Sequence, residues 1–536
     1  MILTAFIIPI FLGSLIIPAH GGNLFGDVNL FDQLPGFMDW LLRRPGSSER
    51  CFENLGCFSR QDFPDPLGNA IIFLPKSPEE MDIKYLMYTQ KNRYEPKNLR
   101  YNFTAQELSD SGFDGTKKTK FIIHGWMSSF DEMDWMGDLK DLILRHKADQ
   151  YNVIGVDWSK GSKTINYFKS VANVRVVAAA TTFFLKRLEE YGRIKFSDVH
   201  LIGHSLGGHI VGYVGKNITN PQIGRITALD PAGPSFYKDG NSRLSSTDAK
   251  YVEAVHTNGG RSILTGYGIT DTLGDIDYYP NGGRKQPECN LMKALDRMIT
   301  KLTGGKRKHH CNHNFANQLM IQDPDTLIES CQFVGYECES WESFQKGYCI
   351  DCGQFGNKCA AISIWGEEDD KLNGAYYRQS NQQEGRGAQQ NRKFFYKTEG
   401  EKDYCLHHYG VVVHTSSQSG SARGMFKLSL NGRRREESNI KLGNKREKYE
   451  GGRSYPFLMT NKRTFGQIQN ATLQWSTGIL GKLNPFHHFM NSKVSVDRLE
   501  IRYMSNIRPE RRKMESTILC SNSQMNSSGQ SFIVCR

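Results

Sequence analysis

The fold is decided at Val199-His-Leu-Ile-Gly203-His-Ser205-Leu-Gly207-Gly208-His-Ile-Val-Gly212, where an apolar strand is expected to lead into a sharp turn and a small-residue helix. In a G-x-S-x-G elbow the central residue takes a strained backbone conformation, and the flanking glycines remove side chains that would collide. The Ser205 hydroxyl would then stand above the sheet as a nucleophile. The pentapeptide alone is a weak signal, and a glycine-rich turn with a bystander serine is the alternative.

Strand-like apolar runs alternate with helical patterns on both sides of this stretch. The runs cover residues 120–123, 152–156, 199–202, 225–229 and 251–255, and residues 171–188 carry apolar side chains at the three-and-four spacing of a helix. Such alternation predicts βαβ units around a mostly parallel sheet. A chain of 536 residues is also long for one core, so we expect a large domain and a smaller one.

Residues that could carry chemistry follow three of these runs. His124-Gly125-Trp126 follows the first, Ser205 the third and Asp230-Pro231-Ala232 the fourth. Open α/β sheets bind ligands beyond the carboxyl ends of their strands. A later histidine would complete the order Ser, Asp, His that α/β-hydrolases use, and among 15 histidines His313 is the best candidate.

The N-terminus and the cysteines indicate a secreted, extracellular protein. Residues 1–21 are apolar and uncharged with small residues at the end, as in a signal peptide, and an uncleaved anchor is the alternative. Residues 22–50 lack periodicity and fit a leader or a trimmed pro-segment. Secretion lets the 12 cysteines form disulfides instead of metal clusters. Glycosylation sequons occur at Asn102, Asn217, Asn470 and Asn526.

Charge and pattern describe the rest of the chain. The net charge of +12 favours acidic partners such as sulfated glycans or anionic lipid surfaces over nucleic acid. Residues 289–311 form an amphipathic segment that could cover the site, and a helix packed permanently on the domain is the alternative. Residues 367–392 are rich in Gln, Asn and Gly and predict a surface loop or linker. Beyond Cys405, alternation in residues 409–413, 424–430, 471–475 and 495–502 predicts a β-sandwich.

Six motifs in order carry a family resemblance. They are Phe121-Ile-Ile-His-Gly-Trp126, Val156-Asp-Trp158, Gly203-His-Ser-Leu-Gly-Gly-His209, Leu229-Asp-Pro-Ala232, Tyr279-Pro-Asn-Gly-Gly283 and Cys311-Asn-His313. From about Cys51 onward the chain resembles the secreted pancreatic lipase and lipoprotein lipase family. The resemblance implies an α/β-hydrolase domain at residues 51–400, with a lid at 289–311, and a PLAT-type β-sandwich domain at residues 401–536.

The resemblance also implies an enzyme that hydrolyses acyl-glycerol esters at a lipid–water interface without an organic cofactor. Ser205 would be the nucleophile, Asp230 the acid and His313 the base, with the backbone N–H groups of Trp126 and Leu206 as oxyanion donors. The long lid is similar to those of triacylglycerol lipases. A 1-acyl phospholipase and a non-enzymatic lipid- or glycan-binding relative are the alternatives, and an intact triad argues against the second.

A structural calcium ion is implied by Arg243-Leu-Ser-Ser-Thr-Asp248, which is similar to the family run R-L-x-P-x-D. Its ligands would be Asp248, Ser245 and the backbone carbonyls of Gly240 and Arg243. Calcium prefers several hard oxygen ligands, and this run supplies one carboxylate, which weakens the expectation of tight binding. A turn without an ion is the alternative.

The family's cysteine pattern implies specific disulfides. The expected pairs are Cys51 with Cys57, Cys289 with Cys311, and Cys520 with Cys535; Cys338, Cys349, Cys352 and Cys359 pair among themselves in an order left open, and the remaining Cys331 and Cys405 would tie the domains together.

Two surface features suggest partners. Leu483, Phe486 and Phe489 lie where lipoprotein lipases carry a lipid-contact loop, and sandwich core is the alternative. Basic runs at residues 306–308, 433–435, 445–446 and 511–513 could bind heparan sulfate, although solvated charge explains any single run equally well. The sequence does not identify a protein helper.

Overall fold

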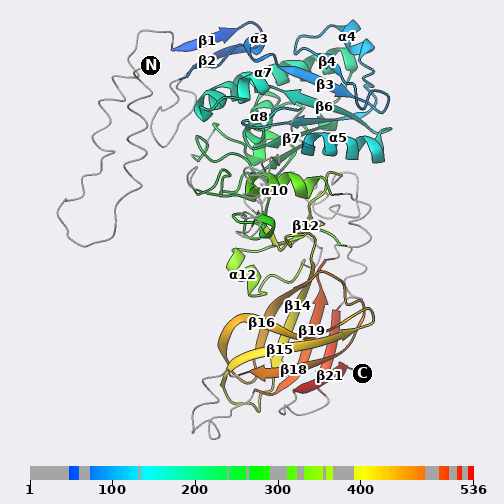
Figure 1. The fold of residues 1–536 in the computed structure, drawn as a ribbon, viewed down its shortest axis with the longest axis vertical. Helices are drawn as coiled ribbons and strands as arrows, with labels where there is room; N and C mark the ends of the chain where they lie inside the picture. Colours follow the sequence, from blue (N-terminus) through cyan, green and yellow to red (C-terminus); the bar gives the residue numbers. More distant parts are fainter. Residues whose placement is uncertain are drawn as a thin grey trace, which may run out of the picture. The chain divides into compact units, whose positions relative to one another are not determined.

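The computed structural model describes residues 48–59, 73–130, 134–237, 241–260, 265–289, 311–322, 331–353, 358–365, 392–401, 403–476, 494–505, 516–521 and 529–535. Figure 1 shows their elements, which form an 11-stranded sheet, an 8-stranded sheet and a short hairpin of β1 (Glu49–Phe52) and β2 (Gly56–Ser59). All of these elements belong to one compact unit, Glu49–Arg536.

The 11-stranded sheet has a parallel centre and antiparallel edges. Strands β6, β5, β7, β8, β9, β10 and β13 are parallel neighbours, while β3 and β4 close one edge and β11 and β12 the other in antiparallel pairing. The predicted α/β class and mostly parallel sheet are therefore confirmed. The strands are β3 (Lys84–Tyr88), β4 (Lys97–Leu99), β5 (Lys118–Ile123), β6 (Tyr151–Asp157), β7 (Val199–His204), β8 (Arg225–Leu229), β9 (Tyr251–Val255), β10 (Ile276–Pro280), β11 (Val334–Glu337), β12 (Cys359–Ala361) and β13 (Arg392–Tyr396).

Helices cover both faces of this sheet, so the side chains on both sides of its central strands are mostly buried. Phe121 and Ile123 of β5 pack in one core cluster with helices α7 (Tyr167–Gly192) and α8 (Leu206–Asn217). Ile122 points to the opposite face, into a second cluster with α5 (Asp134–Lys147) and α10 (Cys311–Met320). Helix α7 is apolar and long enough to cross a membrane, but 72% of its most apolar window is buried in this core. Its composition is therefore explained by packing.

Short helices fill the connections. They are α3 (Pro78–Met81), α4 (Ala105–Asp110), α6 (Ser159–Ser162), η2 (Phe196–Asp198), η3 (Ser246–Asp248), η4 (Pro287–Cys289) and α12 (Trp341–Gln345). Both α3 and α4 begin with capping boxes, from Ser77 to Glu80 and from Thr104 to Glu107. These boxes satisfy amide groups that a helix start leaves without an intrahelical partner.

The second sheet is antiparallel, in the order β16-β15-β18-β21-β20-β19-β14-β17. Its inward side chains alternate along the strands, as Phe426, Leu428 and Leu430 of β15 show, and they enclose a third core cluster. The predicted β-sandwich domain is consistent with this arrangement. The strands are β14 (His407–Thr415), β15 (Ala422–Gly432), β16 (Glu436–Tyr449), β17 (Ser454–Asn461), β18 (Ile468–Ser476), β19 (Val496–Tyr503), β20 (Ser516–Ser521) and β21 (Gln530–Val534).

Six disulfides use all of the cysteines. The pairs Cys51–Cys57, Cys289–Cys311 and Cys520–Cys535 form as expected, and the order left open resolves into Cys338–Cys349 and Cys352–Cys359. Cys331 pairs with Cys405, but both belong to the core cluster on the α5 and α10 face of the first sheet. This bridge therefore closes the first domain and does not tie it to the second, because Cys405 still packs in the α/β core.

Candidate active site

Ser205 occupies a sharp turn between β7 and α8. Its backbone angles are φ 58° and ψ −119°, a conformation that costs a non-glycine residue strain energy. The flanking glycines make the turn sterically feasible, because a Cβ on Gly203 would lie 2.2 Å from the carbonyl oxygen of Gly207. The elbow expected from the sequence is therefore present as a local structure.

Backbone hydrogen bonds tie the elbow to the strand end that carries Asp230. The Ser205 amide donates to the Leu229 carbonyl at 3.0 Å, and the Ala232 amide donates to the Ser205 carbonyl at 3.2 Å. Leu229 and Ala232 lie on either side of Asp230 and Pro231. The position of the serine is thus coupled to that of the acid.

Asp230 is a fully buried carboxylate with a hydrogen-bond donor at each oxygen. Its Oδ1 accepts the backbone N–H groups of Thr257 at 2.7 Å and Asn258 at 3.0 Å. Its Oδ2 lies 2.5 Å from Nδ1 of His313. Gly268 leaves room for the carboxylate, since a Cβ there would lie 2.5 Å from Oδ1.

His313 lies in the first turn of α10, and its ring is held next to the elbow. The preceding cysteine, Cys311, begins the helix and is bonded to Cys289. The ring centroid of His313 is 4.7 Å from that of His204, and His204 Nε2 donates to the His313 carbonyl at 3.2 Å. Because His204 directly precedes Ser205, the three predicted catalytic residues come together at the carboxyl ends of β7 and β8.

The acid sets the proton arrangement of the histidine. A carboxylate accepts only, so the hydrogen of His313 lies on Nδ1 and leaves Nε2 able to accept a proton. Among the described residues, the Ser205 hydroxyl makes no hydrogen bond to His313. Such contacts are often long in unliganded enzymes and tighten when substrate binds.

Two backbone amides adjoin the serine. A Cβ on Gly125 would lie 2.6 Å from Ser205 Cβ and 3.1 Å from its Oγ, so the Gly125–Trp126 peptide borders the hydroxyl. Leu206 is the first residue of α8, where an amide has no partner within the helix and the helix dipole is positive. Both predicted oxyanion positions therefore lie next to the nucleophile.

The side chain of His124 orients the first of these peptides. Its Nδ1 lies 3.0 Å from the Gly125 carbonyl oxygen, which can only accept, so Nδ1 carries the hydrogen. In a planar trans peptide the N–H points away from the C=O. Holding the Gly125 carbonyl therefore turns the Trp126 N–H to the side opposite the His124 ring.

Apolar side chains surround this loop. The indole of Trp126 donates to the Thr164 carbonyl at 2.7 Å and packs edge-on against Tyr167. Met127 follows Trp126 in the sequence and Ile165 follows Thr164, and these two side chains are 52% and 93% exposed. Met127 and Ile165 therefore present apolar side chains to solvent close to the buried catalytic residues.

In the loop expected to hold calcium, a lysine ammonium contacts the side chains of two of the expected ligand residues. Lys216, at the end of α8, donates from Nζ to the Asp248 carboxylate at 2.6 Å and to Ser245 Oγ at 3.4 Å. The Ser245 amide and hydroxyl donate to the same carboxylate at 2.9 and 3.0 Å. The Arg243 side chain bonds the Asp271 carboxylate at 3.0 Å, and Gly240 lies outside the described residues.

The side chains of Asp248 and Ser245, as the structure describes them, do not fit a calcium ion. Calcium takes about six to eight oxygen ligands, whereas both side-chain donors here are already hydrogen-bonded and their single negative charge is neutralised by Lys216. Burial raises the pKa of Asp248, and Lys216 and Ser245 oppose that shift. The loop also packs tightly on α8, since a Cβ on Gly215 would lie 2.1 Å from the Asp248 carbonyl oxygen. We therefore derive no step that uses calcium.

The remaining predicted sites divide by position. Asn102, Asn217 and Asn470 are exposed. The lid between Cys289 and Cys311, the loop with Leu483, Phe486 and Phe489, and the sequon at Asn526 lie outside the described residues.

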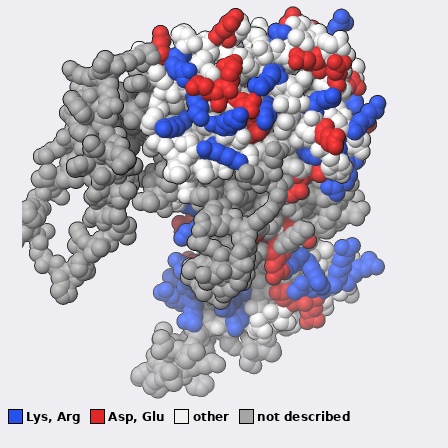
Figure 2. Space-filling view, turned by 45° about the horizontal axis from the view of Figure 1, so that its top comes forward, with Lys and Arg blue, Asp and Glu red and all other residues white. Residues whose placement is uncertain are grey.

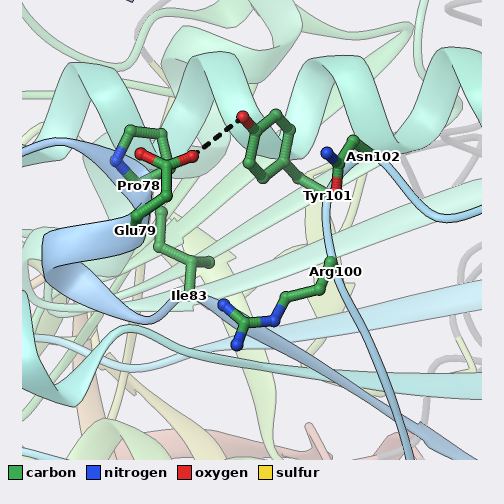
Figure 3. A pocket seen from close by; sticks show the side chains of 6 residues that line it. All are labelled: Pro78, Glu79, Ile83, Arg100, Tyr101 and Asn102. Carbon is green, nitrogen blue, oxygen red and sulfur yellow. Dashed lines mark hydrogen bonds between the residues drawn. The ribbon is translucent and has the colours of Figure 1, made fainter.

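A pocket drawn in Figure 3 lies apart from the catalytic residues. It is lined by Pro78, Glu79, Ile83, Arg100, Tyr101 and Asn102. The Tyr101 hydroxyl donates to the Glu79 carboxylate at 3.1 Å across it. Neither Ser205 nor Asp230 nor His313 lines this pocket, so it is not the candidate active site.

Sequence reasoning missed several groups that shape the site. The amides of Thr257 and Asn258 are backbone groups and have no sequence signature. The role of the His124 ring was missed although the motif contains it, because a motif does not say which atom each ring nitrogen faces.

Comparisons with known proteins find similar sequences among lipases and lipase-related proteins. The family model described as Lipase matches residues 48–385. The chain is 30% identical over 465 residues to the pancreatic triacylglycerol lipase of Mus musculus, covering 85% of this chain and 93% of that protein. It is 30% identical over 490 residues to the inactive pancreatic lipase-related protein 1 of Homo sapiens, covering 90% and 97%. It is also 30% identical over 400 residues to human pancreatic lipase-related protein 2, covering 73% and 79%.

Proposed function

The chain belongs to the lipase family, and we propose that it is a secreted interfacial serine hydrolase that cleaves acyl-glycerol esters, with triacylglycerol as its main substrate. One observation carries the proposal: the Asp230–His313 hydrogen bond lies beside the strained turn that holds Ser205. Six disulfides and the apolar N-terminal segment support an extracellular location.

The reaction would proceed in two stages. In the first, His313 Nε2 takes the Ser205 hydroxyl proton as Oγ attacks the ester carbonyl carbon, and Asp230 stabilises the imidazolium. The tetrahedral intermediate collapses, His313 returns the proton to the leaving glyceride oxygen, and an acyl-enzyme forms. In the second stage, water attacks that ester with the same base and releases the fatty acid.

The negative charge on the carbonyl oxygen would be stabilised by the N–H groups of Trp126 and Leu206. Fixed donors act strongly in such a site because they need no reorganisation during the reaction. Losing one typically costs about 3 kcal/mol of transition-state stabilisation. The His124 contact with the Gly125 carbonyl supports this assignment, since it aims one of the two donors.

Two features support a glyceride at an interface as the substrate. Met127 and Ile165 expose apolar surface beside the oxyanion loop, where they could contact lipid. Residues 290–310, which lie between Cys289 and Cys311, give the proposed lid 21 residues. The family resemblance associates a lid of this length with neutral glycerides.

The test is fatty acid release from emulsified triacylglycerol and from phosphatidylcholine vesicles, comparing wild type with Ser205→Ala. We expect release from triacylglycerol that the alanine variant abolishes. Faster release from phosphatidylcholine would favour the 1-acyl phospholipase. Because one relative is named inactive, binding to both lipids without release would instead favour a lipid-binding role.

Heparan sulfate is proposed as a partner on the basis of the basic runs at residues 433–435 and 445–446. Arg435 is 2.9 Å from Glu437, so part of this charge is paired within the protein. On the face drawn in Figure 2, acidic and basic side chains are interspersed. The test is the salt concentration that elutes the protein from a heparin column. Elution of wild type at high salt, and of the Arg433→Ser/Arg434→Ser double variant at clearly lower salt, would support the proposal.

A further inference from the structure

A buried glutamine connects the two halves of the Asp230–His313 pair. Gln286 follows β10 and directly precedes η4, and it is 3% exposed. It is hydrogen-bonded on one side to Thr257, whose peptide donates to Asp230, and on the other to Asn312, the residue before His313. Neither contact is part of the catalytic assignment above.

On the acid side, Gln286 holds the peptide that donates to Asp230. Its Nε2 donates to the Thr257 carbonyl at 2.8 Å. That carbonyl belongs to the same peptide as the Asn258 N–H, which donates to Asp230 Oδ1 at 3.0 Å. Because a trans peptide places C=O and N–H on opposite sides, this one unit lies between the glutamine amide and the carboxylate. Hydrogen bonds arranged in such a chain polarise one another.

On the base side, Gln286 holds the start of α10. Its backbone N–H donates to Asn312 Oδ1 at 2.8 Å, and Asn312 directly precedes His313. The disulfide between Cys289 and Cys311 adds a covalent link close by. The segment 286–289 is therefore attached to residues 311–312 at two points.

The orientation of the glutamine amide follows from its partners. Nε2 faces two carbonyl oxygens, those of Thr257 and Pro280, at 2.8 and 3.2 Å, and carbonyls only accept. Oε1 accepts from Asn281 Nδ2 at 2.8 Å. A glutamate would bring a negative oxygen against two carbonyls, and a methionine would fill the same space without donating.

We propose that Gln286 is a positioning residue that sets the Asp230–His313 geometry by holding the Asn258 amide on the carboxylate and the start of α10 beside it. The proposal rests on the hydrolase function proposed above. Gln286 touches neither substrate nor reacting atoms. Its side chain acts through the Thr257–Asn258 peptide, and its backbone N–H, which Gln286→Met retains, holds Asn312.

The test compares Gln286→Met with Gln530→Met. Gln530 is also 3% exposed and also donates from Nε2 to a backbone carbonyl, that of Val496 at 2.7 Å, but it lies in the second sheet. On a soluble short-chain ester we expect Gln286→Met to lower kcat about ten- to a hundredfold with little change in KM. Gln530→Met should leave kcat unchanged at equal folded fraction, measured by active-site titration with a phosphonate ester.

A second readout does not depend on turnover. The proton on His313 Nδ1, bonded to a carboxylate, gives a strongly downfield proton resonance, and we expect Gln286→Met to shift or broaden it. Wild-type kcat together with an unshifted resonance in Gln286→Met would overturn the proposal, as would equal losses in both variants. If the wild type hydrolyses no ester, the hydrolase function fails, while the resonance still decides whether Gln286 positions the pair.

Discussion

Replacing Lys216 by methionine tests how the Arg243–Asp248 loop is held. The change removes the ammonium from the Asp248 carboxylate and leaves the rest of the side chain to pack. Asp248 is 2% exposed, so its charge cannot be hydrated in place of the lost partner. We expect a loss of stability in the α/β domain, because an unpaired buried charge is costly.

The size of the loss can be bounded from both sides. Breaking a buried ion pair by removing one partner typically costs about 3–5 kcal/mol. Lys216 belongs at the lower end, because its side chain is 19% exposed and Ser245 still donates twice to the carboxylate. Protonation limits the cost: at pH 7, neutralising a carboxyl with an ordinary pKa of 3.8 takes about 4 kcal/mol, at about 1.4 kcal/mol per pH unit. We expect about 3 kcal/mol.

Urea denaturation followed by tryptophan fluorescence measures this quantity. Lys216→Arg keeps the charge and should retain most of the stability. Lys346→Met is the matched control, because Lys346 forms an exposed pair with Glu342 at 2.9 Å, and its loss should change nothing measurable. Adding millimolar Ca²⁺ or a chelator should not move the wild-type transition, since the donors are already used.

Two results would refute this reasoning. One is a Lys216→Met protein as stable as wild type, which would mean that the ammonium does not hold the carboxylate. The other is a wild-type transition that rises clearly with Ca²⁺, because a bound ion stabilises the folded state by mass action. That result would restore the calcium site expected from the family resemblance.

Three other predictions concern the site, its rim and the strand ends behind it. Gly268→Ala would place a Cβ 2.5 Å from the Asp230 carboxylate, so kcat/KM on a soluble ester should fall at least about tenfold while circular dichroism stays unchanged. Ile165→Asp should reduce activity on emulsified triacylglycerol and spare the soluble ester, because we propose that this 93% exposed side chain contacts lipid and not the reacting atoms; equal losses on both substrates would contradict this. Burial lowers the pKa of His256, but the hydrogen bond to Asp277 at 2.8 Å, the charge of that carboxylate, the contact with the Ile269 carbonyl and the charge of Asp230 together outweigh burial and leave the pKa raised. A raised folded-state pKa gives stability that is complete below about pH 6.5 and disappears as pH rises through the folded-state value, so urea denaturation should show the stability gap between wild type and His256→Phe narrowing toward alkaline pH.

The fold class could be predicted from the sequence because the spacing of apolar residues within one segment indicates which of its side chains are buried. The residue runs 225–229 and 251–255 were predicted as strands, and they match β8 and β9. Their side chains are all buried, and most of them are apolar, so the pattern of a buried strand is visible in the sequence. Helix α7 was predicted from its spacing for the same reason.

Other elements left a weak pattern or none. Strand β16 has the sequence EESNIKLGNKREKY and is mostly exposed, so its pairing with β15 produces no hydrophobic alternation. Strands β11 and β12 are only four and three residues long and lie among cysteines for which the family resemblance implied disulfides but no strand. Pairing with a neighbouring strand, and not a local hydrophobic pattern, makes these segments strands.

By itself the sequence determined the sheet, the sandwich and which residues are candidates for chemistry: Ser205 in its glycine-flanked turn, Asp230 at a strand end and His313 after a cysteine. The tertiary structure alone decided that Gln286 is hydrogen-bonded to both the Thr257 carbonyl and Asn312, and that Lys216 is paired with the Asp248 carboxylate. The physical reason is that the spacing of apolar residues in a segment depends on which side chains of that segment are buried. A hydrogen bond between residues far apart in the chain depends on how several packed segments meet, and no local pattern encodes that meeting.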